Sequence, residues 1–437
     1  MRVIIFLVIF LISHCSYSQT DYQKFSKSEL LEDFHELYKS AIQIHPKLAS
    51  KEFLNEFTRL YELQKDRIED SLNLNEFYLI AAPLLASLND AHTNVIIPNK
   101  PRIQYMLHNN GLSFPFDISI RSDSIFLKYY FGNEIFNYNE SESVQSINGI
   151  ANSELLKQMR SLTGAKKRSI QNRTIERYFR SYLWMIWGFE DDYDLVFQDD
   201  SKLNISGVDN DTFLQNRIPK DLANYSLKVD SLQKIAFLKI KSFAHLESFV
   251  PFVDSAFLAI QKTNCNKLVI DVRENMGGRS IVVDSLMNFL TQQTYAQYKS
   301  IKLRVSEPLK AYYAKRPYKL KSINYPNDTI IAVSGKEIQP HYKSSKFKGG
   351  LYVWVSARTF SAASTFAGLI KHLGIGKIVG EETGGTIGYY GDFWFQKLPN
   401  TQMTYYISPK EFVQFGGDDL DKGVSVDFSE INYNVLD

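Results

Sequence analysis

The chain has 437 residues, of which 44% are hydrophobic and 14% aromatic, so it can bury the cores of two or three domains. Its formal net charge of +2 at pH 7 lacks the basic excess typical of a nucleic-acid-binding protein. Its two cysteines, Cys15 and Cys265, are too few for a disulfide framework.

The N-terminus has the pattern of a secretory signal peptide. An unbroken apolar run, residues 3–12, follows Arg2, and the small residues Ser16 and Ser18 come after it. As a helix the run would reach about 15 Å, about half of a bilayer core, so it is too short to span a membrane. We therefore predict cleavage of residues 1–18 and export to the periplasm or the cell exterior, with no membrane span.

Residues 19–98 are predicted to form a helical domain. Apolar side chains recur with a 3.6-residue period in segments 30–42, 53–61 and 77–88, which is typical of helices packed against a core. The first helix is preceded by Ser26 and Glu29 at capping-box spacing, and Pro46 ends it.

Residues 99–230 are predicted to be rich in β-structure. A strand at 143–147, an Asn-Gly turn and a helix at 153–159 resemble the closing part of a PDZ-type module, a fold that binds extended peptides. An ordinary β-rich insert is the alternative interpretation.

Residues 231–437 alternate apolar strands with amphipathic helices. The strands are expected at 235–240, 268–272, 352–356 and 377–381, and the helices at 249–261, 281–290 and 362–373. This alternation predicts an α/β fold whose mostly parallel sheet is covered on both faces. A hairpin at 393–407, turning at residues 399–400, adds antiparallel strands.

Two segments have the residue types that acyl transfer needs. Segment 271–278 (DVRENMGG) closes a buried strand with two glycines, and segment 358–363 (RTFSAA) places Ser361 where a strand gives way to a helix. Ser361 is the candidate nucleophile, and the backbone amides of Gly277, Gly278 and Ala362 are the candidate oxyanion hole. A helix N-cap is the alternative role for Ser361.

These two segments, together with segments 88–93 (LNDAHT) and 379–383 (VGEET), resemble the C-terminal-processing (tail-specific) serine protease family. The likeness is to its tricorn-core and interphotoreceptor retinoid-binding branch. It covers residues from about 75 to 430 and implies a ClpP/crotonase-like core and a polypeptide substrate. We expect neither a metal nor an organic cofactor, because the chain has no HExxH motif, clustered cysteines or P-loop. In the tricorn-like branch the histidine of the first segment is the general base, which points to His92. An imidazole can take and return a proton near neutral pH.

The chain departs from the family pattern at three places. One is Ser364, inside the first turn of the nucleophile helix, where the family usually has a glutamate. The bacterial enzymes pair the serine with a lysine 25 residues later, and here that position is Thr386, which leaves His92 as the candidate base. The family glutamate that would orient the histidine is missing from residues 417–422. Three other carboxylates are candidates for that place: Asp421 first, then Asp419 or Glu381.

Residues 299–348 form a basic insert, with twelve lysines and arginines against three acidic residues. The segment is either a solvated, poorly ordered excursion or a lid that attracts acidic groups or a substrate C-terminus.

Taken together, the sequence predicts an exported serine peptidase that cleaves unfolded or short polypeptides through an acyl-enzyme. The alternative is a catalytically silent protein that binds a ligand or peptide on the same fold. Acyl-CoA chemistry is disfavoured because export would separate the chain from cytosolic CoA. Oligomeric state is not indicated by any pattern in the chain.

Overall fold

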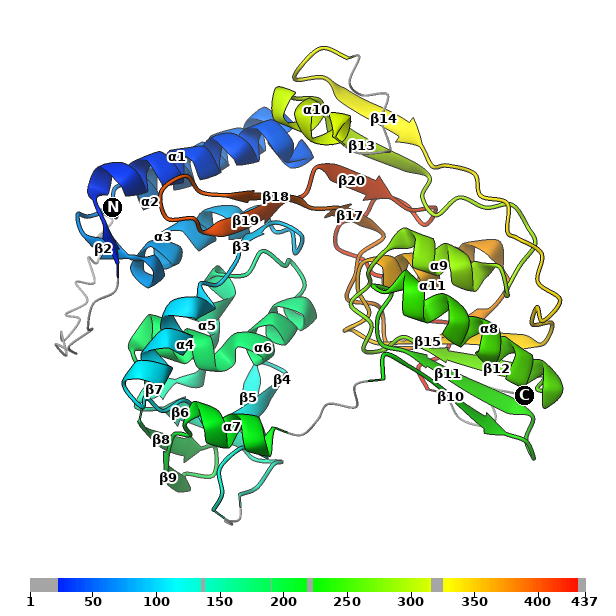
Figure 1. The fold of residues 1–437 in the computed structure, drawn as a ribbon, viewed down its shortest axis with the longest axis horizontal. Coiled ribbons are helices and arrows are strands. Elements are labelled where there is room, and N and C mark those ends of the chain that lie inside the picture. The colour runs from blue at the N-terminus through cyan, green and yellow to red at the C-terminus, as the bar shows by residue number, and fades with distance from the viewer. Residues whose placement is uncertain (1–22, 135–137, 190, 218–222, 316–324, 431–437) are drawn as a thin grey trace, which may run out of the picture.

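The computed structural model describes residues 23–134, 138–189, 191–217, 223–315 and 325–430 (Figure 1). The predicted signal peptide, residues 1–18, lies outside these ranges. Within them, no helix is both long and apolar enough to cross a membrane.

The N-terminal part is a layer of three helices, as predicted. Ser26 and Glu29 form the predicted capping box at the start of the first helix, and that helix ends just before Pro46. A short helical turn and a two-stranded pairing complete the layer. Its elements are β1 (Lys24–Phe25), α1 (Lys27–Ile44), η1 (Pro46–Ala49), α2 (Lys51–Lys65), β2 (Leu72–Asn73) and α3 (Leu74–Ala86).

The middle part is an antiparallel sheet flanked by helices. Its strands are β4 (Phe116–Arg121), β5 (Ser124–Tyr130), β6 (Ser143–Ile147), β7 (Ile150–Ala151), β8 (Asp192–Phe197) and β9 (Lys202–Ser206). The order is β4-β5-β6-β8-β9, with β7 paired to β6. The helices are α4 (Asn99–His108), α5 (Asn152–Ser161), α6 (Arg168–Trp187) and α7 (Asn210–Asn216), and α6 packs against the edge strand β4. The likeness to a PDZ module stays a prediction.

The third part is built on a five-stranded sheet of order β10-β11-β12-β15-β16, and the mixed α/β class predicted from the sequence is confirmed. The strands are β10 (Tyr225–Asp230), β11 (Ile235–Ile240), β12 (Lys267–Asp271), β15 (Gly350–Val355) and β16 (Lys377–Gly380). All neighbours are parallel except the pair β10 and β11. The helices are α8 (Leu246–Lys262), α9 (Ser280–Met287) and α11 (Ala362–Leu373).

The prediction that helices cover both faces of this sheet is wrong. Helices α8, α9 and α11 share one hydrophobic cluster and lie together on one face (Figure 1). The opposite face presents Phe237, Tyr352 and Trp354, which are only half-buried. Large aromatic residues in a strand suggest a buried face when only the sequence is known, although such side chains are often incompletely buried. This face borders a cavity of about 840 Å³ whose other wall, with Arg121 and Asn172, belongs to the middle part.

The basic insert is not a poorly ordered excursion where the structure describes it. It forms β13 (Ser300–Arg304), α10 (Glu307–Ala314) and β14 (Ile330–Ser334). These strands continue into a sheet of order β14-β13-β20-β17 with β17 (Gly388–Gly391) and β20 (Lys410–Val413). Leu303 and Leu309 are buried, because one side of this charged segment packs against the N-terminal helices.

A three-stranded sheet joins the two ends of the chain. Its strands, in the order β18-β19-β3, are β18 (Trp394–Lys397), β19 (Thr404–Ile407) and β3 (Asn94–Val95). The predicted hairpin at 393–407 is therefore present, and it lies beside the N-terminal helices in Figure 1. This pairing matters for the site because β3 directly follows the segment 88–93.

Candidate active site

Ser361 lies at the junction between β15 and α11, as the sequence predicts. Its backbone has φ 52° and ψ −128°, a left-handed conformation that costs energy for any residue except glycine. Although Ser361 occupies the N-cap position of α11, its side chain makes no capping hydrogen bond. The hydroxyl Oγ lies instead 3.1 Å from Nε2 of His92. The strained turn therefore directs the hydroxyl to the imidazole, and the structure does not use it as a helix cap.

His92 lies in the loop between α3 and β3 and is 5% exposed. Its backbone carbonyl accepts a hydrogen bond from the hydroxyl of Ser408 (3.1 Å), the residue that follows β19. The imidazole stacks on the ring of Phe360, with 4.9 Å between centroids, and on Tyr389 at 5.9 Å. The loop and the ring are thus held from several sides, which fixes the direction of Nε2.

Asp90 is the carboxylate beside this imidazole. Its Oδ1 lies 3.7 Å from Nδ1 of His92 and accepts the backbone N–H of the same residue at 2.9 Å. Its Oδ2 accepts the hydroxyls of Thr93 (2.6 Å) and Ser408, and lies 3.4 Å from Nε2 of His45. Burial alone would raise the pKa of Asp90, but the hydrogen bonds and charges of His45 and His92 outweigh it and hold that pKa well below its usual range.

Asp421, Asp419 and Glu381, the three carboxylates proposed from the sequence, all lie in the described part of the chain, and none of them contacts His92. Asp421 is exposed and pairs with the ammonium of Lys166. Asp419 accepts the backbone N–H of Asp421 (2.8 Å), and Glu381 lies 3.4 Å from the backbone N of Ala357. Asp419 and Asp421 were expected only because the family has its glutamate just before the segment that begins at Gly423.

Asp90 was missed although it belongs to the same segment, 88–93, as His92. Its position two residues before His92 could have identified it. An aspartate commonly accepts the backbone N–H two residues later, and this turn brings Asp90 close to the imidazole of residue i+2. His45, which contacts the other oxygen of Asp90, is fully buried and lies between α1 and η1. No local pattern in the sequence relates it to Asp90, which is 45 positions away.

The glycine segment 277–278 lies directly against the serine. Gly277 has φ 96°, and a Cβ there would come within 2.8 Å of both Ser361 Cβ and Ala362 N. Its N–H, however, donates to the side-chain oxygen of Asn275 at 2.7 Å. This amide already has a partner, which corrects its assignment to the oxyanion hole. The amides of Gly278 and Ala362 stay the predicted donors.

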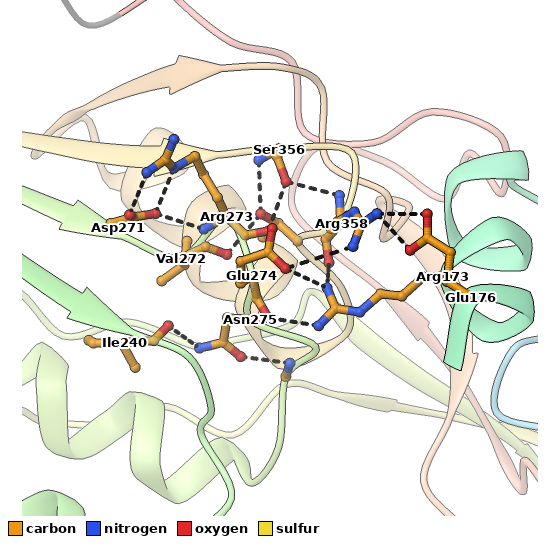
Figure 2. A network of polar contacts seen from close by, with 12 residues as sticks. Arg173, Glu176, Ile240, Asp271, Val272, Arg273, Glu274, Asn275, Ser356 and Arg358 are labelled. Carbon is orange, nitrogen blue, oxygen red and sulfur yellow. Dashed lines mark hydrogen bonds and ion pairs between the residues drawn. The ribbon is translucent and has the colours of Figure 1, made fainter. Parts of the chain in front are cut away.

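One helix of the middle part holds the turn that leads to Ser361. The guanidinium of Arg358 donates to both carboxylate oxygens of Glu176 in α6, at 2.9 and 2.7 Å (Figure 2). Glu176 also accepts the backbone N–H of Ile120 in β4 at 2.8 Å. The side chain of Glu176 is 10% exposed and that of Arg358 is 37% exposed, so the carboxylate is the buried partner of this pair.

The same helix also holds the segment that leads to the glycines. Arg173, one turn before Glu176, donates to the backbone carbonyl of Glu274 at 3.0 Å (Figure 2). The hydroxyl of Ser356 links the two segments by donating to the carbonyl of Arg273 at 2.7 Å. Helix α6 therefore positions both the serine turn and the glycine turn relative to each other.

A cavity of about 250 Å³ lies beside His92 and Phe360. Thr386, the position where the bacterial enzymes have their lysine, lines it and donates its hydroxyl to the carbonyl of Gly388 at 2.6 Å. Three lysines also line it: Lys47, Lys166 and Lys167. Among the described residues of the basic insert, none lines this cavity, so they do not form a lid over it.

Comparisons with known proteins agree with this architecture. Residues 234–427 match the family described as Peptidase family S41. The crystal structure of mature CPAF is 13% identical to this chain, with 92% of each chain covered and a TM-score of 0.64. The structure of mature CPAF complexed with lactacystin is 14% identical, with 92% of this chain and 93% of that chain covered and a TM-score of 0.63. The photosystem II D1 C-terminal processing protease is 14% identical over 92% of each chain, with a TM-score of 0.48. The likeness to CPAF shows a shared fold over most of both chains.

Proposed function

We propose that this chain is an exported serine-type peptidase that acts on unfolded or short polypeptides. The match of residues 234–427 to peptidase family S41 supports the peptidase activity. Ser361 is the nucleophile and His92 the general base. The observation that carries the proposal is the 3.1 Å distance between Ser361 Oγ and His92 Nε2, two residues 269 positions apart. Nucleophile and base within hydrogen-bond reach are the arrangement that serine catalysis requires.

The reaction follows from that geometry. As Ser361 Oγ attacks the carbonyl carbon of the scissile bond, His92 Nε2 takes the hydroxyl proton. The resulting oxyanion accepts hydrogen bonds from the amides of Gly278 and Ala362, at the positive end of helix α11. His92 then gives its proton to the departing amine, which leaves an acyl-enzyme. A water deprotonated by the same imidazole releases the acyl group and restores the serine.

Asp90 supports this cycle as a positioning residue. Its carboxylate stays ionised at neutral pH, because its pKa is held low, and it lies on the Nδ1 side of the ring. A negative charge there orients the imidazole and stabilises the imidazolium that forms during attack. The 3.7 Å separation is longer than a hydrogen bond, and such contacts tighten when substrate binds.

The choice of substrate rests on the burial of the site. His92 and Asp90 are 5% and 4% exposed, and the adjoining cavity has a volume of only about 250 Å³, so an extended chain can reach Ser361 more readily than a folded domain can. Export is supported by the N-terminal apolar run and the small residues after it.

The test is hydrolysis of a reduced, unfolded polypeptide by the purified protein, with the products identified by mass spectrometry. We expect cleavage by the wild type and none by Ser361→Ala. Ser364→Ala is the matched control, because the buried hydroxyl of Ser364 donates to the carbonyl of Thr359 (2.9 Å) and takes no part in the reaction. A wild-type protein that binds the polypeptide but never cleaves it would support the silent binding protein instead.

A further inference from the structure

Lys47 differs from the other lysines of the cavity beside His92. Its ammonium donates to the backbone carbonyl of Leu88 at 2.8 Å and lies 4.6 Å from the centroid of the Phe53 ring. Lys166 and Lys167 pair with carboxylates of other segments, Asp421 and Glu382. Among the described residues, no carboxylate forms an ion pair with Lys47.

The surroundings of Lys47 leave its charge poorly compensated. Burial lowers the pKa of Lys47, and the neighbouring charge of Lys166 lowers it further. The more distant carboxylates of Asp90 and Glu56 act in the opposite direction but do not reverse the shift. An anion in the cavity would therefore form an ion pair with this ammonium, which none of the described carboxylates does.

This ammonium lines the same cavity as the imidazole of His92. The cavity, about 250 Å³, is lined by Lys47 as well as by His92 and Phe360. Its other walls include the apolar Leu88, Ile170, Tyr390 and Leu420 as well as the polar Asn89 and Asp90. The carboxylate of Asp90 is already engaged by His45, Thr93 and Ser408. A ligand that fills it therefore needs an apolar body and one negatively charged group within reach of Lys47.

We propose that Lys47, reinforced by the charge of Lys166, binds a carboxylate of the substrate and so selects the peptides that the site accepts. This inference rests on the proposed peptidase function and adds the class of substrate to it. Two groups of a peptide have this chemistry: its C-terminal carboxylate and an aspartate or glutamate side chain. The Lys166–Asp421 pair is solvent-exposed, so Lys166 can turn to the substrate at small cost.

The experiment measures binding without turnover, using Ser361→Ala protein and short fluorescent peptides with apolar residues. One pair of peptides differs only in a free or an amidated C-terminus, and a second pair only in an internal glutamate or glutamine. We expect one acidic peptide to bind roughly tenfold to a hundredfold more tightly than its neutral partner, the usual range for a charged hydrogen bond. The pair that shows the difference identifies the source of the carboxylate.

Variants then assign the preference to Lys47. Lys47→Met in the Ser361→Ala background should remove the difference between acidic and neutral peptides, whereas Lys47→Arg should keep most of it. Lys51→Met is the matched control, since Lys51 is exposed at the start of α2 and does not line the cavity. If Lys47→Met does not fold, Lys47→Gln replaces it, with the native melting temperature as the criterion.

Either of two results would overturn the inference: equal affinity for both members of each pair, or a preference that persists without the Lys47 charge. Neither result would contradict the proposed peptidase activity, because cleavage by the wild type is measured separately. Conversely, if the wild type cleaves no peptide but prefers acidic peptides through Lys47, the proposed binding site stands and the proposed peptidase activity is wrong.

Discussion

The carboxylate of Asp90 lies 3.7 Å from Nδ1 of His92 and also accepts the backbone N–H of that histidine at 2.9 Å. The acid and the base of the proposed site thus come from one turn, only two residues apart. The nucleophile comes from the other end of the chain. This local turn and the strand pairing that follows it help to orient the imidazole, together with the rings of Phe360 and Tyr389 that stack on it.

Asp90→Asn should lower kcat by about a hundredfold to ten-thousandfold, since an amide neither fixes the tautomer of His92 nor stabilises its protonated form. KM should change less than kcat, because the negative charge of Asp90 acts mainly on the imidazolium that forms during attack. Steady-state kinetics on a peptide substrate measure both constants. A variant with wild-type kcat would show that Asp90 is only structural.

The low pKa of Asp90 also predicts how stability depends on pH. Because the folded-state pKa is depressed, the ionised carboxylate contributes stability above its unfolded value of about 3.9 and loses that contribution as pH falls toward the folded-state pKa. We therefore expect the free energy of unfolding of wild type to exceed that of Asp90→Asn most at neutral pH. The gap should shrink in acid below about pH 4. Denaturant titrations of both proteins across this range measure it, and a gap that widens in acid would contradict the assignment.

Glu176→Ala should slow the reaction although Glu176 touches neither Ser361 nor His92. Without it, the guanidinium of Arg358 and the N–H of Ile120 lose their acceptor, and the serine turn loses its anchor to α6. We expect kcat to fall about tenfold to a hundredfold, the effect of a small misplacement of reacting groups, with a smaller change in KM.

A double-mutant cycle separates this positioning from a general loss of stability. Arg358→Ala added to Glu176→Ala should cost little more than either change alone, because both remove the same contact. Glu154→Ala, which removes a long surface pair with Lys157 on α5, is the matched control and should leave kcat unchanged. Additive losses in the cycle would mean that the two residues act separately.

Gly277→Ala should abolish activity, because its Cβ would lie 2.8 Å from Ser361 Cβ and from Ala362 N. The change should also cost about 1–3 kcal/mol of stability through the unfavourable φ of 96°. Gly149→Ala is a matched control: Gly149 has φ 77° but nothing within 4 Å of the added Cβ. Both variants should lose stability, as thermal unfolding would show, and only Gly277→Ala should lose activity.

The sequence predicted best those features that depend on local pattern. The bounds of α11 and of β11 agree with the segments expected, because an apolar run bounded by polar turns determines each of them. The distance between His92 and Ser361 was expected only from the family resemblance, since no local pattern relates positions 269 apart.

The features that the sequence did not reveal depend on tertiary contacts. The N–H of Gly277 is satisfied by Asn275, and the half-buried state of Trp354 depends on the cavity next to the middle part. The basic insert was judged by its charge, although burial of Leu303 on one side decides its structure. Residue types alone specify neither hydrogen-bond partners nor which face of a strand meets another segment.

The central claim, that His92 activates Ser361, is tested most directly by a fluorophosphonate probe, which reacts readily only with a serine that has a base beside it. Mass spectrometry of the labelled wild-type protein should locate the adduct on Ser361. Ser361→Ala should not be labelled, and His92→Ala should be labelled almost as poorly, because nucleophile and base act as a unit. Ser364→Ala should react like the wild type. An unlabelled wild type across about pH 6 to 9, or an adduct on another residue, would contradict the account.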